Sequence, residues 1–216
     1  MDETIKIWDL DTGREYRTFR GVTSCIHDIA FCPDGTLLAS SSSDNVVRLW
    51  DVERGEIRAF LDGHLGAVNA IQFSPDGKQI LSGSDDTTVK LWNATNATES
   101  ITFKGHRRKV LTVAFSRDAG LVASGSEDMN VKIWSAATGA LLRTLPHTSG
   151  VNAIAFSPTA ALLASCTFDV ELKLWDAENG EALGEFEKHE EDVETPLVRS
   201  QVGLVDEADE LSLIHI

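Results

Sequence analysis

The stretch SGSDDTTVKLWN, residues 82–93, occurs along the chain in several closely similar copies. It returns as SGSEDMNVKIWS at 124–135, and it occurs earlier as SSSSDNVVRLWD at 40–51. The tryptophans follow the same period, with spacings of 42, 42, 42 and 41 residues between Trp8, Trp50, Trp92, Trp134 and Trp175. A period of this length predicts a fold built from one repeated supersecondary unit.

Each repeat reads as four short β-strands. In the copy that contains Trp92, the turn SPDG separates VNAIQF at 68–73 from QILSGS at 79–84, and a polar turn separates TVKLW at 88–92 from SITF at 100–103. Alternating or β-branched residues between regularly spaced turn residues favour strands over helices. One such sheet cannot bury both of its faces, so neighbouring units are predicted to stack.

Composition and charge narrow the functional classes. Apolar residues make up 42% of the 216 residues, charged residues make up 25%, and the formal net charge is −15. The only basic cluster is the short run KGHRRK at 104–109, which predicts that neither nucleic acid nor an anionic membrane is a partner. Three cysteines without metal-ligand spacing and an N-terminus without an apolar signal segment favour a cytoplasmic protein, with the nucleus as the other intracellular possibility.

The dipeptides GH at 63–64 and 105–106 and WD at 8–9, 50–51 and 175–176, at a period of about 42 residues, resemble the WD-repeat (WD40) β-propeller family. The resemblance implies an all-β fold in which each repeat is a four-stranded blade. Residues 1–188 are predicted to form a propeller segment, with a partial blade over 1–20 and four complete blades over about 22–61, 64–103, 106–145 and 147–186. A further partial blade is expected to begin at 188–189, and the segment is expected to belong to a seven-bladed ring whose remaining blades are missing from this chain.

Serine, histidine, aspartate and tryptophan recur at fixed offsets within the repeat. Catalysis by a Ser-His-Asp triad needs a single cleft, whereas this pattern is copied into each sheet at constant phase, so a structural role is favoured. The resemblance implies a hydrogen-bonded tetrad that fixes a loop onto its blade. The predicted sets are His64, Ser82, Asp86 and Trp92; His106, Ser124, Asp128 and Trp134; and His147, Ser165, Asp169 and Trp175.

The first complete repeat departs from this pattern. Valine occupies the histidine position at Val22, while Ser40, Asp44 and Trp50 remain. We expect this blade to be the least rigid, because its aspartate and serine are predicted to have lost a hydrogen-bonding partner.

The resemblance also indicates where partners bind. WD-repeat proteins usually hold ligands on the face formed by the loops that lead into the innermost strands and by the turns between strands two and three. Leu111 and Phe168 are apolar at such positions, which favours anchoring of a partner, although packing of Phe168 on its neighbour is the alternative. The basic loop around Lys109 could meet an acidic segment, or it could be simply solvated. The predicted partner-binding face comprises His27, Asn69, Asp85, Lys109, Leu111, Glu127, Asn152 and Phe168.

The repeat pattern fails after residue 188. Residues 189–210 are acidic and place Pro196 where the preceding repeat pattern has an inner strand, so they are predicted to be an acidic tail or a failed fifth blade. The last six residues, LSLIHI at 211–216, are predicted to be a sequence artefact. Their reverse translation CTG-TCT-CTT-ATA-CAC-ATC resembles a transposase end sequence used in library preparation.

These patterns predict a non-catalytic scaffold that binds protein or peptide segments and assembles a multiprotein complex. The sequence has no glycine-rich phosphate loop, metal-ligand cluster or unique acid pair, so neither a cofactor nor a metal is expected. Two alternatives stay open. The repeats could be a regulatory or substrate-docking domain of a larger enzyme, such as a ubiquitin ligase or a signalling protein, or a four-bladed protein could dimerise to close a ring.

Overall fold

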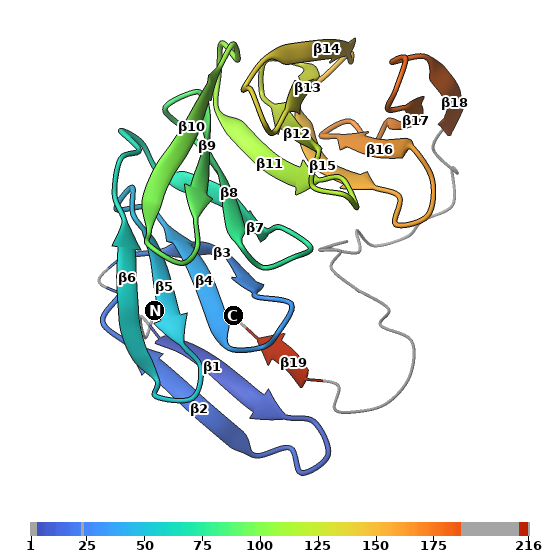
Figure 1. Ribbon diagram of the computed structural model, residues 1–216. Helices are drawn as coiled ribbons and strands as arrows, with labels where there is room; N and C mark the ends of the chain where they lie inside the picture. Colours follow the sequence, from blue (N-terminus) through green and yellow to red (C-terminus); the bar gives the residue numbers. More distant parts are fainter. Residues whose placement is uncertain (1–3, 23, 187–211, 216) are drawn as a thin grey trace.

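A computed structural model describes residues 4–22, 24–186 and 212–215. Its regular structure consists of β-strands arranged in five antiparallel sheets (Figure 1). Within these residues no helix has the length and apolar character needed to cross a membrane. The segment predicted as an acidic tail or failed blade, 189–210, lies outside the described residues.

Four of the sheets have the same four-stranded up-and-down order, and we number them II to V. Sheet II contains β3 (Ile26–Phe31), β4 (Leu37–Ser42), β5 (Val47–Asp51) and β6 (Glu56–Leu61). Sheet III contains β7 (Val68–Phe73), β8 (Gln79–Ser84), β9 (Thr88–Asn93) and β10 (Thr98–Lys104). Sheet IV contains β11 (Val110–Phe115), β12 (Leu121–Ser126), β13 (Asn130–Ser135) and β14 (Leu141–Pro146). Sheet V contains β15 (Val151–Phe156), β16 (Leu162–Thr167), β17 (Leu172–Asp176) and β18 (Ala182–Phe186).

Sheet I has three strands. β1 (Thr4–Asp9) pairs with β2 (Glu15–Arg20) on one side and with β19 (Ser212–His215) on the other. β19 therefore takes the place that the second strand occupies in sheets II to V. β19 lies within residues 211–216, which are predicted to be a sequence artefact. The pairing of β19 with β1 does not test that prediction.

The sheets succeed one another around an open arc, with the first strand of each of sheets II to V innermost (Figure 1). β7 contacts both β3 and β11, and β11 in turn contacts β15, so neighbouring sheets meet along their inner strands. The described part of the chain is therefore all-β, with the stacked four-stranded sheets expected of propeller blades.

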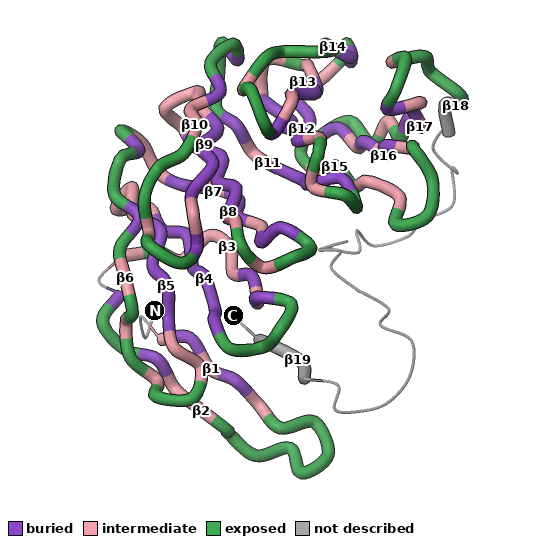
Figure 2. The backbone as a smooth tube through the Cα atoms, viewed as in Figure 1, coloured by how far each residue is buried: buried purple, intermediate pink, exposed green. Residues whose placement is uncertain are grey.

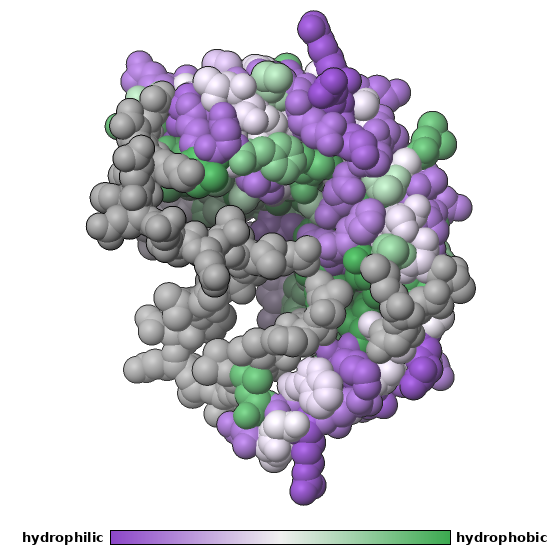
Figure 3. All heavy atoms as spheres, turned by 180° about the vertical axis from the view of Figure 1, so that it is seen from behind, coloured by the Kyte–Doolittle hydropathy of each residue, from purple (hydrophilic) through white to green (hydrophobic). Residues whose placement is uncertain are grey.

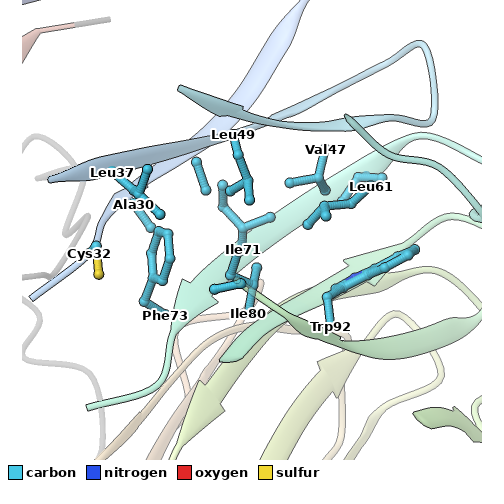
Figure 4. Packing of buried hydrophobic residues seen from close by; sticks show 13 residues of the cluster. Ala30, Cys32, Leu37, Val47, Leu49, Leu61, Ile71, Phe73, Ile80 and Trp92 are labelled. Atoms are coloured by element: carbon cyan, nitrogen blue, oxygen red, sulfur yellow. The ribbon is translucent and has the colours of Figure 1, made fainter. Parts of the chain in front are cut away.

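The core lies between the sheets rather than within any one of them. At the interface of sheets II and III, Ile71, Ile80 and Trp92 from sheet III pack against Leu49 and Leu61 from sheet II (Figure 4). Similar clusters join sheets III and IV and sheets IV and V. Since the second strands are covered on both faces, they read as nearly continuous apolar or small residues instead of alternating ones.

Burial decreases from the middle of each sheet outward. Every residue of β4 is buried, whereas β6 alternates between exposed and partly buried positions up to the buried Leu61, as the colours of Figure 2 show. Viewed from behind, apolar side chains gather around the hollow between the sheets and polar ones dominate the periphery (Figure 3). On the far side of sheet V, Leu172 is 40% exposed, while Val131 at the same position of sheet IV is fully buried.

Candidate interaction face

The predicted tetrads are complete hydrogen-bonded chains in sheets III and IV. In sheet III, His64 Nδ1 lies 2.8 Å from Asp86 Oδ2, and His64 Nε2 lies 2.8 Å from Ser82 Oγ. Trp92 Nε1 donates to the same Ser82 Oγ at 2.8 Å. The His106, Ser124, Asp128 and Trp134 side chains of sheet IV repeat these contacts at 2.8–2.9 Å.

The donors and acceptors around His64 and His106 are consistent with a neutral ring that carries its hydrogen on Nδ1. The serine oxygen accepts from the indole, so its own hydrogen can be donated to His Nε2, and His Nδ1–H then donates to the aspartate. Burial lowers the pKa of His106 despite the neighbouring Asp128, which favours this neutral ring. Burial alone would raise the pKa of Asp86, but the hydrogen bonds from His64 and Thr88 outweigh it and lower the pKa well below its ordinary value.

These serines are unsuited to nucleophilic attack. Ser82 and Ser124 are fully buried, and each oxygen already contacts an indole and an imidazole. A substrate would need access to that oxygen and to an oxyanion site beside it. The geometry therefore favours a structural role for the repeated Ser, His and Asp residues.

Sheet V corrects the prediction for the last tetrad. His147 Nε2 contacts Ser165 Oγ at 2.7 Å and Trp175 donates to the same oxygen, but His147 Nδ1 faces the Leu145 carbonyl at 3.1 Å instead of Asp169. Proline precedes this histidine where glycine precedes His64 and His106, and proline fixes the backbone that leads into the ring. The exposed Asp169 accepts hydrogen bonds from the Thr148 and Thr167 hydroxyls instead.

Sheet II corrects the prediction of a lost partner. Val22 is buried in the apolar cluster between sheets I and II, and Asp44 is bound in a bidentate manner by Arg48, at 3.1 and 2.6 Å. Arginine stands here where Lys90, Lys132 and Lys173 stand in the other sheets. The Arg48 guanidinium thus replaces the imidazole, and Ser40 still accepts from Trp50 at 2.9 Å. The expectation that Asp44 lacks a partner is wrong.

The strand order places two sets of connections at opposite ends of each sheet. We call the loops before the inner strands together with the turns between second and third strands the loop face, and the remaining turns the opposite face. On the loop face, the amide of each turn residue donates to a carbonyl of the preceding loop. These pairs are Ser43 with Cys25, Asp85 with Ala67, Glu127 with Lys109 and Phe168 with Gly150, at 2.8–3.0 Å.

One residue near the start of each inner strand is left out of the pairing with the second strand as a β-bulge. These residues are His27, Asn69, Leu111 and Asn152. His27 Nδ1 and Asn69 Nδ2 reach the carbonyl oxygen of the first inner-strand residue in the next sheet, Val68 and Val110, at 3.1 and 2.9 Å. In sheets II and III this predicted partner position therefore joins neighbouring sheets, whereas the bulge of sheet IV holds the half-buried, apolar Leu111.

An ion pair crosses from sheet III to the loop before sheet IV. Lys109 Nζ lies 2.8 Å from Asp85 Oδ2, and Asn69 Nδ2 donates to Asp85 Oδ1 at 2.8 Å. Partial burial would raise the pKa of Asp85, but the hydrogen bonds from Asn69 and Lys109 lower it. The hydrogen bond to Asp85 in turn raises the pKa of Lys109. Lys109 is thus engaged within the face, while the side chains of Arg107 and Arg108 have no ion-pair partner among the described residues.

Phe168 lies over a glycine. A Cβ built on Gly150 would lie 2.9 Å from the Phe168 ring and 3.3 Å from Glu127 Cα, so the missing side chain makes room for the ring against the loop. The ring is nevertheless 58% exposed. Packing on Gly150 therefore accounts for only part of its surface.

Three further apolar residues are exposed on the loop face, and the sequence patterns did not predict them: Leu65, Met129 and Val170. Met129 and Val170 follow the turn aspartate and have left-handed φ angles of 63° and 67°. Asn45 and Thr87 hold the same conformation in sheets II and III. The available signal was the replacement of a polar turn residue by an apolar one at a fixed repeat position.

The family comparison agrees with this geometry. The WD40 family (WD domain, G-beta repeat) matches residues 13–51, 55–93, 97–135 and 139–176, so the chain belongs to that family. A search of curated proteins finds no match. WD40 repeats generally mediate protein–protein interaction and scaffolding, and they are typically non-catalytic modules that bind proteins or peptides.

Proposed function

We propose that this chain is a rigid platform that binds protein segments on its loop face and so assembles a multiprotein complex. The observation that carries the proposal is an asymmetry of exposed apolar side chains. Leu65, Met129, Phe168 and Val170 are exposed on the loop face, whereas the described turns of the opposite face expose only Leu10 among large apolar residues. Exposed apolar side chains surrounded by polar groups are typical of interaction sites.

The tetrads and the Asp44–Arg48 pair support the rigidity that a platform needs. They fasten the loops or turns of the loop face to the body of the sheets II, III and IV. Binding groups held on a rigid scaffold lose less conformational entropy when a partner docks.

We further propose an intracellular location, either cytoplasmic or nuclear. Cys32 and Cys166 form no disulfide, and Cys32 is buried. Burial raises the pKa of the Cys32 thiol to about 11, which keeps it protonated and unreactive. Unpaired cysteines are typical of reducing compartments.

Affinity capture with face-specific variants tests the platform. We expect Leu65→Asp combined with Phe168→Asp to reduce recovery of a partner at least tenfold, because both changes put charge into apolar contacts. The matched control combines Leu10→Asp with Lys78→Asp on the opposite face and should leave recovery unchanged. Loss of the partner only in the control would show that the wrong face was chosen.

A further inference from the structure

Two left-handed turn positions combine strain with apolar exposure. Met129 is 47% exposed and Val170 is 50% exposed, although φ values of 63° and 67° suit asparagine or glycine far better. For a β-branched residue such as Val170 this conformation is a clear outlier. An asparagine at either position would relieve the strain and face water, so the backbone conformation gives no reason for an apolar residue. Strain of this kind points to a functional requirement.

These two residues and Phe168 share one stretch of the loop face. The Met129 carbonyl accepts from the His147 amide at 2.9 Å, which places the 127–129 turn against the loop 147–150. On the other side of that loop, Phe168 lies over Gly150 and Thr148 reaches Asp169. We call Met129, Phe168 and Val170 the anchor cluster.

A pair of guanidinium groups borders the anchor cluster on one side. The Arg107 amide donates to Asp128 Oδ2 at 2.9 Å, so the loop that carries Arg107 and Arg108 lies directly beside the 127–129 turn. Both arginines are exposed, and neither side chain has a hydrogen bond or ion pair within the part of the chain that the structure describes. On the other side, Asp169 and Glu171 flank Val170. Glu171 is ion-paired with Lys173 at 2.8 Å, whereas Asp169 is exposed and accepts hydrogen bonds from the Thr167 and Thr148 hydroxyls, which lower its pKa.

We propose that this surface binds an acidic peptide segment of another protein that carries a bulky apolar side chain next to its acidic residues. The apolar side chain would enter the anchor cluster, and the carboxylates would meet Arg107 and Arg108, which can bind them in a bidentate manner. The exposed Asp169 carboxylate beside Val170 repels carboxylates at the other end, so one orientation of the segment is favoured. The rest of this strongly acidic chain repels such a segment, which restricts binding to this site. This inference rests on the proposed function and specifies the partner.

The test measures fluorescence anisotropy of a labelled peptide, Glu-Asp-Glu-Asp-Gly-Phe-Leu, on titration with the full chain. Two control peptides replace Phe-Leu by Ser-Ser or the four acids by their neutral amides, Gln and Asn. We expect the controls to bind at least tenfold more weakly. We expect Arg107→Glu combined with Arg108→Glu to weaken binding of the acidic peptide about thirtyfold, with Arg58→Glu on β6 as the matched control.

Met129→Asn and Val170→Asn separate the binding role from a structural one. Both variants should raise the melting temperature or leave it unchanged, because strain is relieved, and each should weaken peptide binding about tenfold. Thr87→Asn, at the same position of sheet III, should leave binding unchanged. Peptide binding that is absent, or that is insensitive to all anchor-cluster and arginine changes, overturns the inference.

The two proposals can fail separately. If partner capture depends on Leu65 and Phe168 while the acidic peptide does not bind, the platform stands and the inferred partner chemistry is wrong. If neither capture nor peptide binding responds to any loop-face substitution, both proposals are wrong.

Discussion

At the scale of single residues, a change at one position of the Ser-His-Asp-Trp set is accompanied by a change in the hydrogen-bond partner of the aspartate. Sheets III and IV join aspartate to serine through histidine, sheet II replaces the histidine by Val22 and satisfies Asp44 with Arg48, and sheet V turns His147 away from Asp169. In each of these sheets the aspartate accepts hydrogen bonds from some donor. This matters most where the carboxylate is partly buried, because leaving a buried acceptor without a donor costs about 1–3 kcal/mol, or more if the acceptor is charged.

The difference between sheets IV and V predicts unequal effects of removing the histidine. His106→Ala leaves the half-buried Asp128 without its imidazole donor and should lower the free energy of unfolding by about 2–3 kcal/mol. His147→Ala removes no bond to an aspartate, so it should lower that free energy by about 1 kcal/mol less. Urea unfolding of both variants measures the difference. Equal losses would mean that the histidine–aspartate bond adds no stability.

The bidentate pair of sheet II predicts that Arg48 cannot be replaced by lysine without loss. Arg48→Lys removes one of the two hydrogen bonds to Asp44 and should lower the free energy of unfolding by about 1–2 kcal/mol. Arg58→Lys, on the exposed strand β6 of the same sheet, is the control and should change it by less than about 0.5 kcal/mol. Wild-type stability in Arg48→Lys would show that the single ammonium suffices.

At the scale of strands and turns, sequence repeats and sheets are out of phase. The family repeat at 97–135 begins with β10 of sheet III and ends with β13 of sheet IV. Each repeat therefore contributes its first strand to one sheet and its other three to the next. This overlap joins neighbouring repeats by strand pairing within each sheet. The tight packing between the sheets depends on small residues in the second strand.

Gly125 on β12 illustrates how close this packing is. A Cβ at this position would lie 2.7 Å from Thr112 Cγ2 and 2.8 Å from Val151 Cγ1, between sheets IV and V. Gly125→Ala should therefore destabilise the chain by about 1–3 kcal/mol through overpacking. Gly184→Ala on β18, where a Cβ meets nothing within 4 Å, is the control. Thermal melts of the two variants should differ clearly, and matching melting temperatures would contradict the packing argument.

The left-handed turns predict stabilisation by polar substitution. Met129→Asn should raise the free energy of unfolding by about 0.5–1 kcal/mol, because asparagine tolerates positive φ and Asn45 already holds this conformation in sheet II. Urea unfolding checks the gain, with Met129→Leu as a control that keeps the strain. A loss of stability in Met129→Asn would show that the methionine packs against the fold.

At the scale of the whole molecule, the sheets form an arc stabilised by the apolar interfaces between them and by polar contacts near their inner strands. His27 and Asn69 each bond a carbonyl of the next sheet, and Lys109 pairs with Asp85 of the preceding one. These contacts hold the loop face as one surface. Proton binding at the buried tetrads then links the stability of the whole arc to pH.

We expect the free energy of unfolding to fall in two stages on acidification. Burial lowers the pKa of His106 and His147 below the ordinary value of 6.5, so below about pH 6.5 the unfolded chain binds protons that the folded chain does not. The pKa values of Asp86 and Asp128 are also lowered in the folded chain, so a further loss follows below about pH 4.

Urea unfolding at a series of pH values measures both stages. A variant that lacks both imidazoles, His106→Asn with His147→Asn, should lose the first stage and keep the second. Constant stability between about pH 7 and pH 5 in the wild-type chain would contradict the assignment of buried, neutral histidines.

The repeat, the strands and the positions of the polar sets follow from the amino-acid pattern alone. Periodic tryptophans, turn residues and β-branched runs act over short stretches of chain, so Trp92, Ser82 and the four strands around them could be located without a structure. The resemblance to the WD-repeat family also predicted which positions of each repeat lie on the loop face, because those positions have fixed offsets from the repeated histidine and aspartate.

Which of these residues contact one another depends on how the chain packs in three dimensions. The bidentate Asp44–Arg48 pair, the turn of His147 toward Leu145 and the Lys109–Asp85 pair depend on side-chain rotamers and on how the sheets curve around the arc. The anchor cluster likewise unites residue 129 of sheet IV with residues 168 and 170 of sheet V. Such contacts join residues that are distant in the chain and are set by packing between sheets, which local sequence patterns do not encode.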